Sequence, residues 1–480
     1  MSNIKKNFLY STIITVSNYI FPLLTFPYIS RVLGVNNIGI CNYIDSIIQY
    51  IVLFSLLGTT FVGIREIASV KSNREKLNIT FSSIITLNII TTLIGVIVIL
   101  CLMFFASEFT DYKILLSIGI IKLLGTVFTI DWFYKGLEDF KYITQRTILV
   151  KLFYVASVFL FIKDENDYVI YFILTTMMYV VNTVINCIHA NKYVSLNFKH
   201  LRISHLIKPY IILGLQAILT SMYTSFNVAF LGYVTDTTQV GYYTTATKLF
   251  TIILSVYSAF TGVMVPRMSS LVAQNSINEF KLLLRKSLGL LFSISIPMII
   301  YAMIYCDDII YIIAGDGYAG AVTPARIIMP LILIIGYEQI LVIQTLMPLK
   351  ADKDLFLNSV IGAAVGIIMN VLIVSKLGCM GSAIVWLISE LTVLIAAQYS
   401  VYKRINIGFP LKQLIRQIIP YTPLVFLLFL IHVYIHDALI IRISLSLLVL
   451  SIYFLVIQFY ILKNPVIVSL MQKFQILYKK

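Results

Sequence analysis

Apolar stretches of about 20 residues recur along almost the whole chain, from Phe8 to Leu462. A stretch of this length crosses the hydrocarbon core of a bilayer, roughly 30 Å thick, as a single helix. The composition agrees, because 59% of the 480 residues are hydrophobic and only 12% are charged, whereas soluble domains contain about a quarter charged residues. The sequence therefore predicts an all-α, multi-pass membrane protein without a soluble domain.

The apolar stretches predict fourteen transmembrane helices. These cover residues 8–30, 39–64, 78–106, 112–137, 143–163, 166–190, 208–233, 239–265, 281–305, 323–347, 355–375, 380–402, 415–435 and 441–462. The first stretch follows Lys5 and Lys6 but is too long for a signal peptide and lacks a small-residue cleavage site. We therefore expect it to be retained as the first helix.

The charges between the predicted helices sort by side of the membrane. Basic residues gather in every second connection, such as residues 71–76, 192–208 and 403–416, whereas other connections are acidic, as at Asp307 and Asp308. By the positive-inside rule, this pattern places both termini in the cytoplasm and the protein in the inner (cytoplasmic) membrane. The net charge of +15 is then a property of the cytoplasmic membrane face, and we expect no nucleic-acid partner.

A similar turn-and-helix unit occurs twice in the chain. Residues 33–43 contain Gly39, and residues 240–243 contain Gly241, which follows Gly39 at an offset of 202 residues; Arg65 and Arg267 are separated by the same offset. A parallel repeat forms two lobes around a central cavity, which suits alternating access. The alternative is a chance similarity of two glycine-containing turns.

The repeat predicts how the chain is organised. We expect an N-terminal lobe of helices 1–6 at residues 1–205 and a C-terminal lobe of helices 7–12 at residues 206–410. Helices 13 and 14 and a basic cytoplasmic tail then occupy residues 411–480.

The sequence shows no catalytic motif. Every predicted connection is short, and no G-x-x-x-x-G-K-[ST] run is present. His432 and His436 have the spacing of metal ligands on a helix, but no Glu follows His432 and no third ligand is evident. We therefore expect no enzyme, no metal site and no bound cofactor.

Cationic side chains inside the predicted helices are the first functional candidates, because a charge at mid-bilayer costs at least about 3 kcal/mol. Lys122 and Lys248 lie within the fourth and eighth helices, one in each predicted lobe. On the wall of a central cavity, two such amines would replace water around a pyrophosphate or an acidic sugar. Arg31 and Arg326, near outer helix ends, would extend this path, or would only snorkel to the membrane surface.

Intramembrane acids are candidates for ion coupling. Glu338, Glu390 and Asp45 lie within predicted helices, where an acid commonly binds a proton or a cation during transport. A coupling proton or sodium ion is the one small ligand that we consider. The alternatives are structural hydrogen-bonded acids and, for Asp45 or Asp131, neutralisation of a nearby lysine.

Two prolines are candidate hinges. Pro22 and Pro27 lie inside the first predicted helix, where a proline removes a backbone hydrogen bond and kinks the helix. Kinks that serve packing alone are the alternative.

Several motifs resemble a known transporter superfamily. Ser30-Arg31-Val32-Leu33-Gly34 with Gly39, the segment Asp131–Glu138, and Gln344–Lys350 followed by Gly378–Ala383 and Glu390 occur in this order. Together with the helix pattern, they resemble the polysaccharide-transport branch of the multidrug/oligosaccharidyl-lipid/polysaccharide exporter superfamily, which contains the O-antigen and capsule repeat-unit flippases.

This resemblance implies a flippase for oligosaccharide repeat units linked to undecaprenyl pyrophosphate, working by alternating access with a proton or sodium gradient. The implied partners are the lipid-linked substrate, membrane lipids, and a polysaccharide polymerase with its chain-length regulator. Only two mid-span lysines are present, which leaves open whether the sugar is neutral and the lysines contact only the pyrophosphate.

Three other functions compete with this prediction. A drug or cation antiporter of the same superfamily would have twelve spans and a lysine-poor cavity. A peptidoglycan lipid-precursor flippase would carry more arginines in its first lobe. A membrane oligosaccharide polymerase would show a large outer loop, whereas the outer connections here are short and acidic.

Overall fold

The computed structural model describes residues 3–198, 201–435 and 439–464, and within these ranges it consists of helices and connecting turns, with no strand. In the described part of the chain, eleven helices are long and apolar enough to cross a membrane, or twelve if the bent helix over Thr237–Ala273 is counted as one span. The predicted all-α, multi-pass architecture is therefore confirmed. The count of fourteen spans and the cytoplasmic position of both termini stay predictions, and His436 and the basic tail lie outside the described residues.

The chain divides into two compact units. Unit 1 comprises Met1–Thr244 and Asn370–Cys379, and unit 2 comprises Thr245–Met369 and Met380–Lys480. The first boundary falls later than the predicted one at residue 205, because helices α8 and α9 pack against α1 and α2 within unit 1. The predicted arrangement of six, six and two helices stays a prediction.

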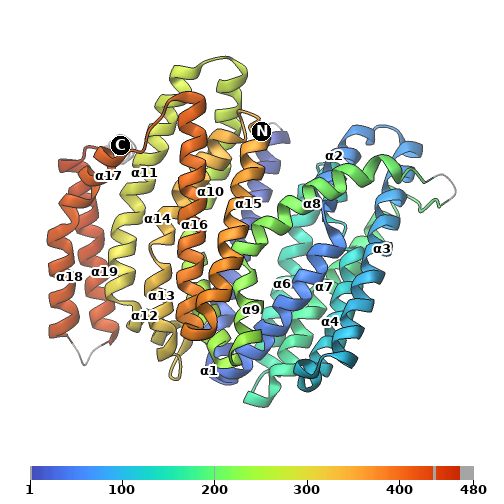
Figure 1. Cartoon of the computed structure of the whole chain (residues 1–480), viewed down its shortest axis with the longest axis horizontal. Coiled ribbons are helices and arrows are strands. Elements are labelled where there is room, and N and C mark those ends of the chain that lie inside the picture. The colour runs from blue at the N-terminus through green and yellow to red at the C-terminus, as the bar shows by residue number, and fades with distance from the viewer. Residues whose placement is uncertain (1–2, 199–200, 436–438, 465–480) are drawn as a thin grey trace, which may run out of the picture. The chain divides into compact units, whose positions relative to one another are not determined.

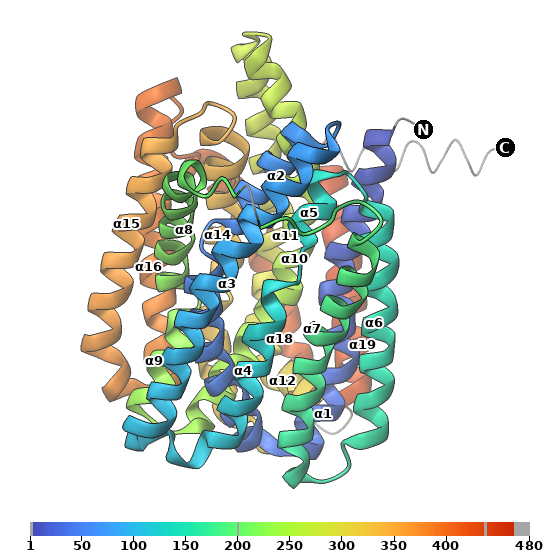
Figure 2. The same ribbon diagram turned by 90° about the vertical axis from the view of Figure 1, so that its right-hand side faces the viewer.

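Unit 1 is a bundle of long helices with short connections (Figure 2). Its helices are α1 (Asn3–Leu56), α2 (Thr59–Val70), α3 (Arg74–Phe105), α4 (Lys113–Val127), α5 (Asp131–Gly136), α6 (Phe140–Phe161), α7 (Tyr168–Ala190), α8 (Ser204–Thr224), α9 (Phe226–Val234) and the start of α10 (Thr237–Ala273). Short 3₁₀ turns at Ser107–Tyr112 and Glu165–Asp167 and a π-helical segment at Asn370–Val374 complete it.

Unit 2 contains the rest of α10 and a second set of helices. These are α11 (Ile277–Ile304), α12 (Cys306–Ala314), α13 (Val322–Ile328), α14 (Leu331–Leu341), α15 (Asp352–Met369), α16 (Ser375–Ile405), α17 (Leu411–Ile418), α18 (Thr422–Tyr434) and α19 (Leu439–Val456). Short segments at Ala319–Ala321, Val342–Leu346, Ile419–Tyr421 and Ile457–Ile461 link or extend them. Helices α18 and α19 pack against each other and against α11 (Figure 1).

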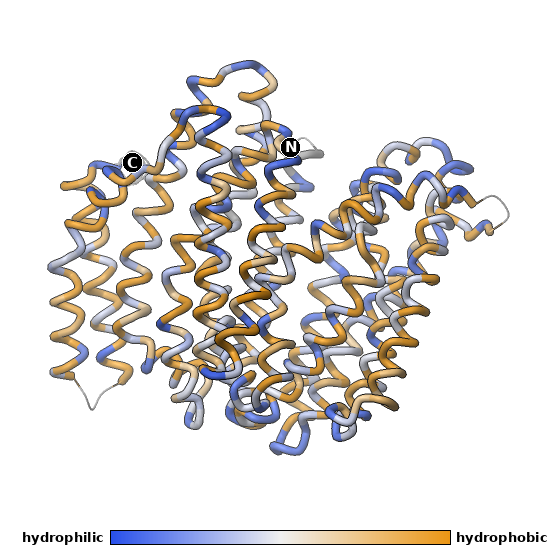
Figure 3. Tube along the Cα trace, viewed as in Figure 1, coloured by the Kyte–Doolittle hydropathy of each residue, from blue (hydrophilic) through white to orange (hydrophobic). Residues whose placement is uncertain are grey.

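Hydrophobic residues occupy most of the length of the helices, and hydrophilic residues gather near their ends and in the connections (Figure 3). Many of the apolar side chains are exposed; on α3, for example, Ile94 is 58% exposed and Ile97 is 59% exposed. Such a surface is stable against acyl chains, whereas in water it would drive aggregation. The pattern supports the membrane assignment made from composition.

Helix α1 contains a kink at a glycine. Gly34 has φ 73° and ψ 170°, the one non-helical conformation inside α1, and a positive φ of this kind is accessible to glycine at little cost. Pro22 and Pro27 lie inside the helical part that precedes it. Their role as hinges stays a prediction.

The second half of α1 and the start of α10 cross at very short range, within unit 1. A Cβ atom added to Gly39 would lie 1.7 Å from the carbonyl oxygen of Thr237, and one added to Gly241 would lie 2.2 Å from that of Val35. The two contacts are reciprocal, because Thr237 follows Val35 by the same 202 residues that separate Gly241 from Gly39.

A hydrogen bond continues this reciprocal contact. Asn42 Nδ2 donates to Thr244 Oγ1 at 2.9 Å, and these residues are also 202 positions apart. Equivalent positions of two copies meet in this way where a two-fold axis passes between them. The contacts therefore support the predicted duplication over the chance similarity of two turns.

Ion pairs with a buried arginine join neighbouring helices in each unit. In unit 1, Arg146 Nη1 on α6 donates to Asp131 Oδ1 on α5 at 2.8 Å and to Asn186 Oδ1 on α7 at 2.6 Å. In unit 2, Arg442 on α19 pairs with Asp308 on α12, and both side chains are buried. Removing one member would leave an uncompensated charge, so each pair fixes the position of its helices.

We expect Gly241→Ala to destabilise the protein. The added Cβ would meet the backbone of α1, which can move away only by opening the crossing, and overpacking of this kind costs about 1–3 kcal/mol. Thermal unfolding of the purified protein in detergent should show a lower midpoint. Gly262→Ala on the same helix is the control, because its Cβ meets nothing within 4 Å; equal midpoints for the two variants would contradict a tight crossing.

Candidate functional site

Unit 1 contains a cavity of about 540 Å³ beside the second half of α1. Helix α1 supplies most of its wall, and Thr60 of α2, Val228 of α9 and Thr244 of α10 complete it, together with Ser221 and Ser225 at the end of α8. This volume lies within the range of small-molecule binding sites, about 300–1,000 Å³. A cavity of this size within an apolar bundle is the first candidate for a substrate site.

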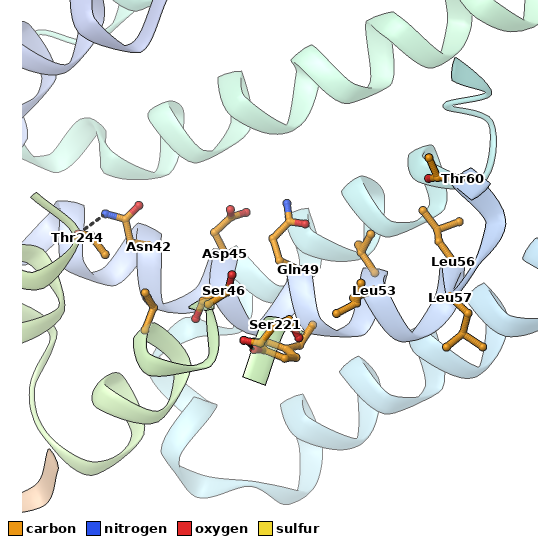
Figure 4. A pocket seen from close by; sticks show the side chains of 14 residues that line it. Asn42, Asp45, Ser46, Gln49, Leu53, Leu56, Leu57, Thr60, Ser221 and Thr244 are labelled. Carbon is orange, nitrogen blue, oxygen red and sulfur yellow. Dashed lines mark hydrogen bonds between the residues drawn. The ribbon is translucent and has the colours of Figure 1, made fainter. Parts of the chain in front are cut away.

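A polar stripe on α1 faces this cavity. Asn42, Asp45, Ser46 and Gln49 all line it, and Figure 4 shows Asn42, Asp45 and Gln49 projecting from the same side of the helix. The spacing i, i+3, i+4, i+7 places these four residues on one helical face. Two amides, a hydroxyl and a carboxylate offer both donors and acceptors, which is the chemistry that sugar hydroxyls require.

The far part of the cavity is apolar. Leu53 and Leu56 of α1 and Leu57, which follows it, line this part beside Thr60 (Figure 4). The site therefore combines a hydrogen-bonding half with an apolar half. Such a surface can contact both the hydroxyls and the C–H faces of a sugar.

Lys122 is buried behind the cavity wall and forms an ion pair with Asp45, which lines the cavity. Its Nζ lies 2.5 Å from Asp45 Oδ1, and it also lies 4.7 Å from the centre of the Tyr179 ring. The Lys122 side chain is 3% exposed, whereas that of Asp45 is 36% exposed. The carboxylate, and not the amine, is therefore the charged group that the cavity presents.

The other predicted cations lie elsewhere. Arg31 is exposed and donates from Nη1 to the Pro27 carbonyl at 2.6 Å. Arg326 belongs to unit 2 and pairs with Asp307 at 2.6 Å. Lys248 is half-buried on α10 in unit 2. The structure thus places two predicted cations in each unit, and their contact with a substrate stays a prediction.

Two of the predicted acids meet inside unit 2. The side chains of Glu338 on α14 and Glu390 on α16 lie close enough to interact electrostatically, and Trp386 Nε1 donates to Glu390 Oε1 at 3.0 Å. Glu390 is 3% exposed. The two predicted acids are therefore neighbours, and their role in ion coupling stays a prediction.

Sequence reasoning missed several polar residues of the site. Asn42, Ser46 and Gln49 are uncharged, so a search for intramembrane charges passed over them, although their helical spacing was a readable signal. Lys151 on α6 was also missed. Its Nζ lies 2.5 Å from Asn18 Oδ1 and 5.6 Å from the centre of the Phe21 ring on α1, next to the predicted hinge.

Solved structures of low sequence identity share this fold. A lipid II flippase, MurJ in an inward closed conformation, superimposes with a TM-score of 0.79 at 16% identity, covering 94% of this chain and 98% of that one. A multidrug resistance MATE family transporter of the MOP superfamily, in an inward-facing conformation, gives a TM-score of 0.62 at 14% identity, covering 82% and 98%. The chain therefore shares the fold of these two proteins.

Sequence comparison points to one family within that fold. A protein named "Putative O-antigen transporter" from Escherichia coli (strain K12) is 25% identical over 357 residues, which covers 73% of this chain and 85% of the relative. A protein of the same name from Shigella dysenteriae is 25% identical over 283 residues, covering 58% and 70%. The model of the family described as "Polysaccharide biosynthesis protein" matches residues 4–272, more than half of the chain. This chain therefore belongs to the polysaccharide biosynthesis protein family.

Proposed function

We propose that the protein is a flippase for lipid-linked oligosaccharide repeat units of the O-antigen or capsule type. It moves them from the cytoplasmic to the outer leaflet of the inner membrane by alternating access, with undecaprenyl pyrophosphate as the carrier. Family membership and the two transporter relatives support this assignment. The observation that carries it is the polar cavity of unit 1, because a sugar leaving water must find replacement hydrogen bonds inside the membrane.

The cavity also favours one class of sugar. Asp45 presents a carboxylate to the cavity while its counter-charge, Lys122, is buried behind it. A second carboxylate on the substrate would meet a like charge, which costs several kcal/mol. The proposed head group is therefore a neutral sugar or an amino sugar.

The same fold serves other transporters, and the family match favours a polysaccharide function for this chain over theirs. The MurJ and MATE structures share the fold at 14–16% identity, which leaves peptidoglycan-precursor transport and drug antiport as competing functions. The polysaccharide family model matches residues 4–272, the part of the chain that includes every residue lining the cavity. This match favours an oligosaccharide substrate.

Loss of the gene tests the proposed function. We expect lipid-linked repeat units to accumulate on the cytoplasmic leaflet and surface polysaccharide to disappear. Supplying Gln49→Ala should restore export roughly three- to tenfold less well than wild type, since a hydrogen bond contributes about 0.5–1.5 kcal/mol. The measurement is the amount of surface polysaccharide, with protein abundance determined in parallel.

Gln274→Ala is the matched control for this test, because Gln274, in the turn directly after α10, is exposed and does not line the cavity. Normal outer display in the deletion strain would contradict the flippase assignment. If surface polysaccharide requires the gene but is unchanged in Gln49→Ala, only the role of the cavity is contradicted.

We further propose that Lys122, Lys248, Arg31 and Arg326 contact the pyrophosphate during transport. Replacing Lys122 or Lys248 with Ala should weaken export about tenfold without loss of protein, since a hydrogen bond to a charged group contributes about 1.5–3 kcal/mol. The Asp45 carboxylate is 36% exposed, so water can solvate it after the amine is removed. Export and abundance are measured as above, with Lys353→Ala as the exposed control.

Lys122 also neutralises Asp45 through their ion pair. A double variant distinguishes this role from contact with the pyrophosphate. If Lys122 only neutralises Asp45, then Asp45→Asn/Lys122→Met should export better than Lys122→Met alone. If the amine contacts the pyrophosphate, the double variant should remain impaired. Normal export by both Lys122→Ala and Lys248→Ala would refute the proposed phosphate contacts.

We propose that Glu338 and Glu390 couple transport to a proton gradient. Glu338→Gln keeps a hydrogen-bonding side chain but cannot exchange a proton, so proton release on substrate addition should be lost. The measurement uses inverted vesicles with a pH-sensitive dye and the lipid-linked oligosaccharide extracted from the deletion strain. Glu279→Gln, an exposed residue, should release protons as wild type does.

The buffer composition distinguishes the coupling ion. Proton release that persists in Glu338→Gln at normal abundance would exclude the pair as the coupling site. Release that appears only in sodium-containing buffer would assign sodium instead of the proton.

A further inference from the structure

Unit 2 contains a second recess, which is separate from the cavity of unit 1 and of different composition. Its volume is about 240 Å³, and it is formed by one face of α11, one face of α17 and the chain after Ile461. The cations Arg285, Lys286 and Arg416 line it, with no Asp or Glu among the lining residues. A concave site with three positive charges selects for an anion.

The three cations keep their charge available for a ligand. All three side chains are exposed, and in the described ranges none of them forms an ion pair. The residues that follow Asn464 contain no Asp or Glu either. The positive charge of the recess is therefore not neutralised by acids of the segment that continues from its wall.

The floor of the recess is a fixed polar network. Gln417 and Asn464 line it and are 8% and 6% exposed. Asn464 Nδ2 donates to Ser293 Oγ at 2.9 Å and to Gln458 Oε1 at 3.1 Å, and Gln458 Nε2 donates to Gln417 Oε1 at 3.4 Å. Since these amides are held by one another, the recess is preformed and not a gap between mobile side chains.

Apolar side chains adjoin the cations. Leu282, Leu290 and Leu462 line the recess itself, and Leu282 is 54% exposed. On the neighbouring helix, Ile415 is 45% exposed and Ile419 is 62% exposed. In a membrane-spanning bundle such residues contact acyl chains. A ligand that fits this combination carries a phosphate and a hydrocarbon chain, which distinguishes a lipid from a soluble anion.

The charge pattern also indicates which leaflet the recess faces. Arg285, Lys286 and Arg416 belong to the basic connections that the positive-inside rule places on the cytoplasmic side. The cytoplasmic leaflet carries anionic lipids, which attract juxtamembrane Lys and Arg. We propose that this recess binds the phosphate of an anionic glycerophospholipid from the cytoplasmic leaflet.

Lipid retention after purification tests this proposal. Full-length protein is reconstituted into vesicles of equal parts phosphatidylcholine and phosphatidylglycerol, extracted in detergent, and its bound lipids are measured by native mass spectrometry. Wild type should retain phosphatidylglycerol in preference to phosphatidylcholine. Arg285→Gln/Arg416→Gln should retain roughly tenfold less phosphatidylglycerol, because two charges near the phosphate are removed.

The control removes the same charge from the same helices. Lys281→Gln/Lys412→Gln changes residues of α11 and α17 that do not line the recess, and it should retain lipid as wild type does. Equal phosphatidylglycerol retention by the two double variants would overturn the proposal. If the first double variant is not recovered folded, Arg416→Gln alone should still lower retention, and unchanged retention there would overturn it as well.

A further experiment determines which kind of lipid supplies the phosphate. Vesicles of phosphatidylcholine with added undecaprenyl phosphate present the same charge on a different hydrocarbon chain. Retention of undecaprenyl phosphate but not of phosphatidylglycerol would overturn the assignment to a glycerophospholipid. Because lipid retention requires no transport, its outcome is independent of the flippase proposal.

Discussion

The close crossing of α1 and α10 in unit 1 determines where the cavity can form. Gly39 and Gly241 allow backbone to approach backbone, and Asn42 is bonded to Thr244 one turn further along. From this contact the polar face of α1 continues through Asp45 to Gln49, and Asn42, Asp45 and Gln49 all line the cavity. The glycines thus fix the rotation of α1 about its axis, and with it the direction of the polar stripe.

Buried charge is accommodated in two different ways in the two units. Lys122 is paired with Asp45, and Arg442 is paired with Asp308. Glu390, in contrast, accepts a hydrogen bond from the neutral Trp386 and lies beside a second acid, Glu338. The salt bridges hold helices together with fixed charges, whereas neighbouring acids inside a membrane commonly bind a proton or a cation. This difference is why we propose coupling at the acids and not at the salt bridges.

The fold class, the membrane assignment and the duplication follow from local sequence signals, because apolar length and glycine spacing are visible along the chain. The partners of the buried charges cannot be read from local sequence signals. Lys122 and Asp45 are 77 residues apart, and only tertiary packing decides whether the amine or the carboxylate reaches the cavity. The polar stripe lies between these cases, since its helical spacing is local but its exposure to a cavity instead of to lipid depends on α8 and α9.

The buried position of Lys122 changes how the site discriminates between substrates. An exposed amine in the wall would attract any anion, including the pyrophosphate common to all undecaprenyl-linked repeats. In the proposed function, the Asp45 carboxylate instead repels acidic sugars and leaves neutral ones to be bound by Asn42 and Gln49. Lys122 then reaches the pyrophosphate only when its salt bridge with Asp45 opens.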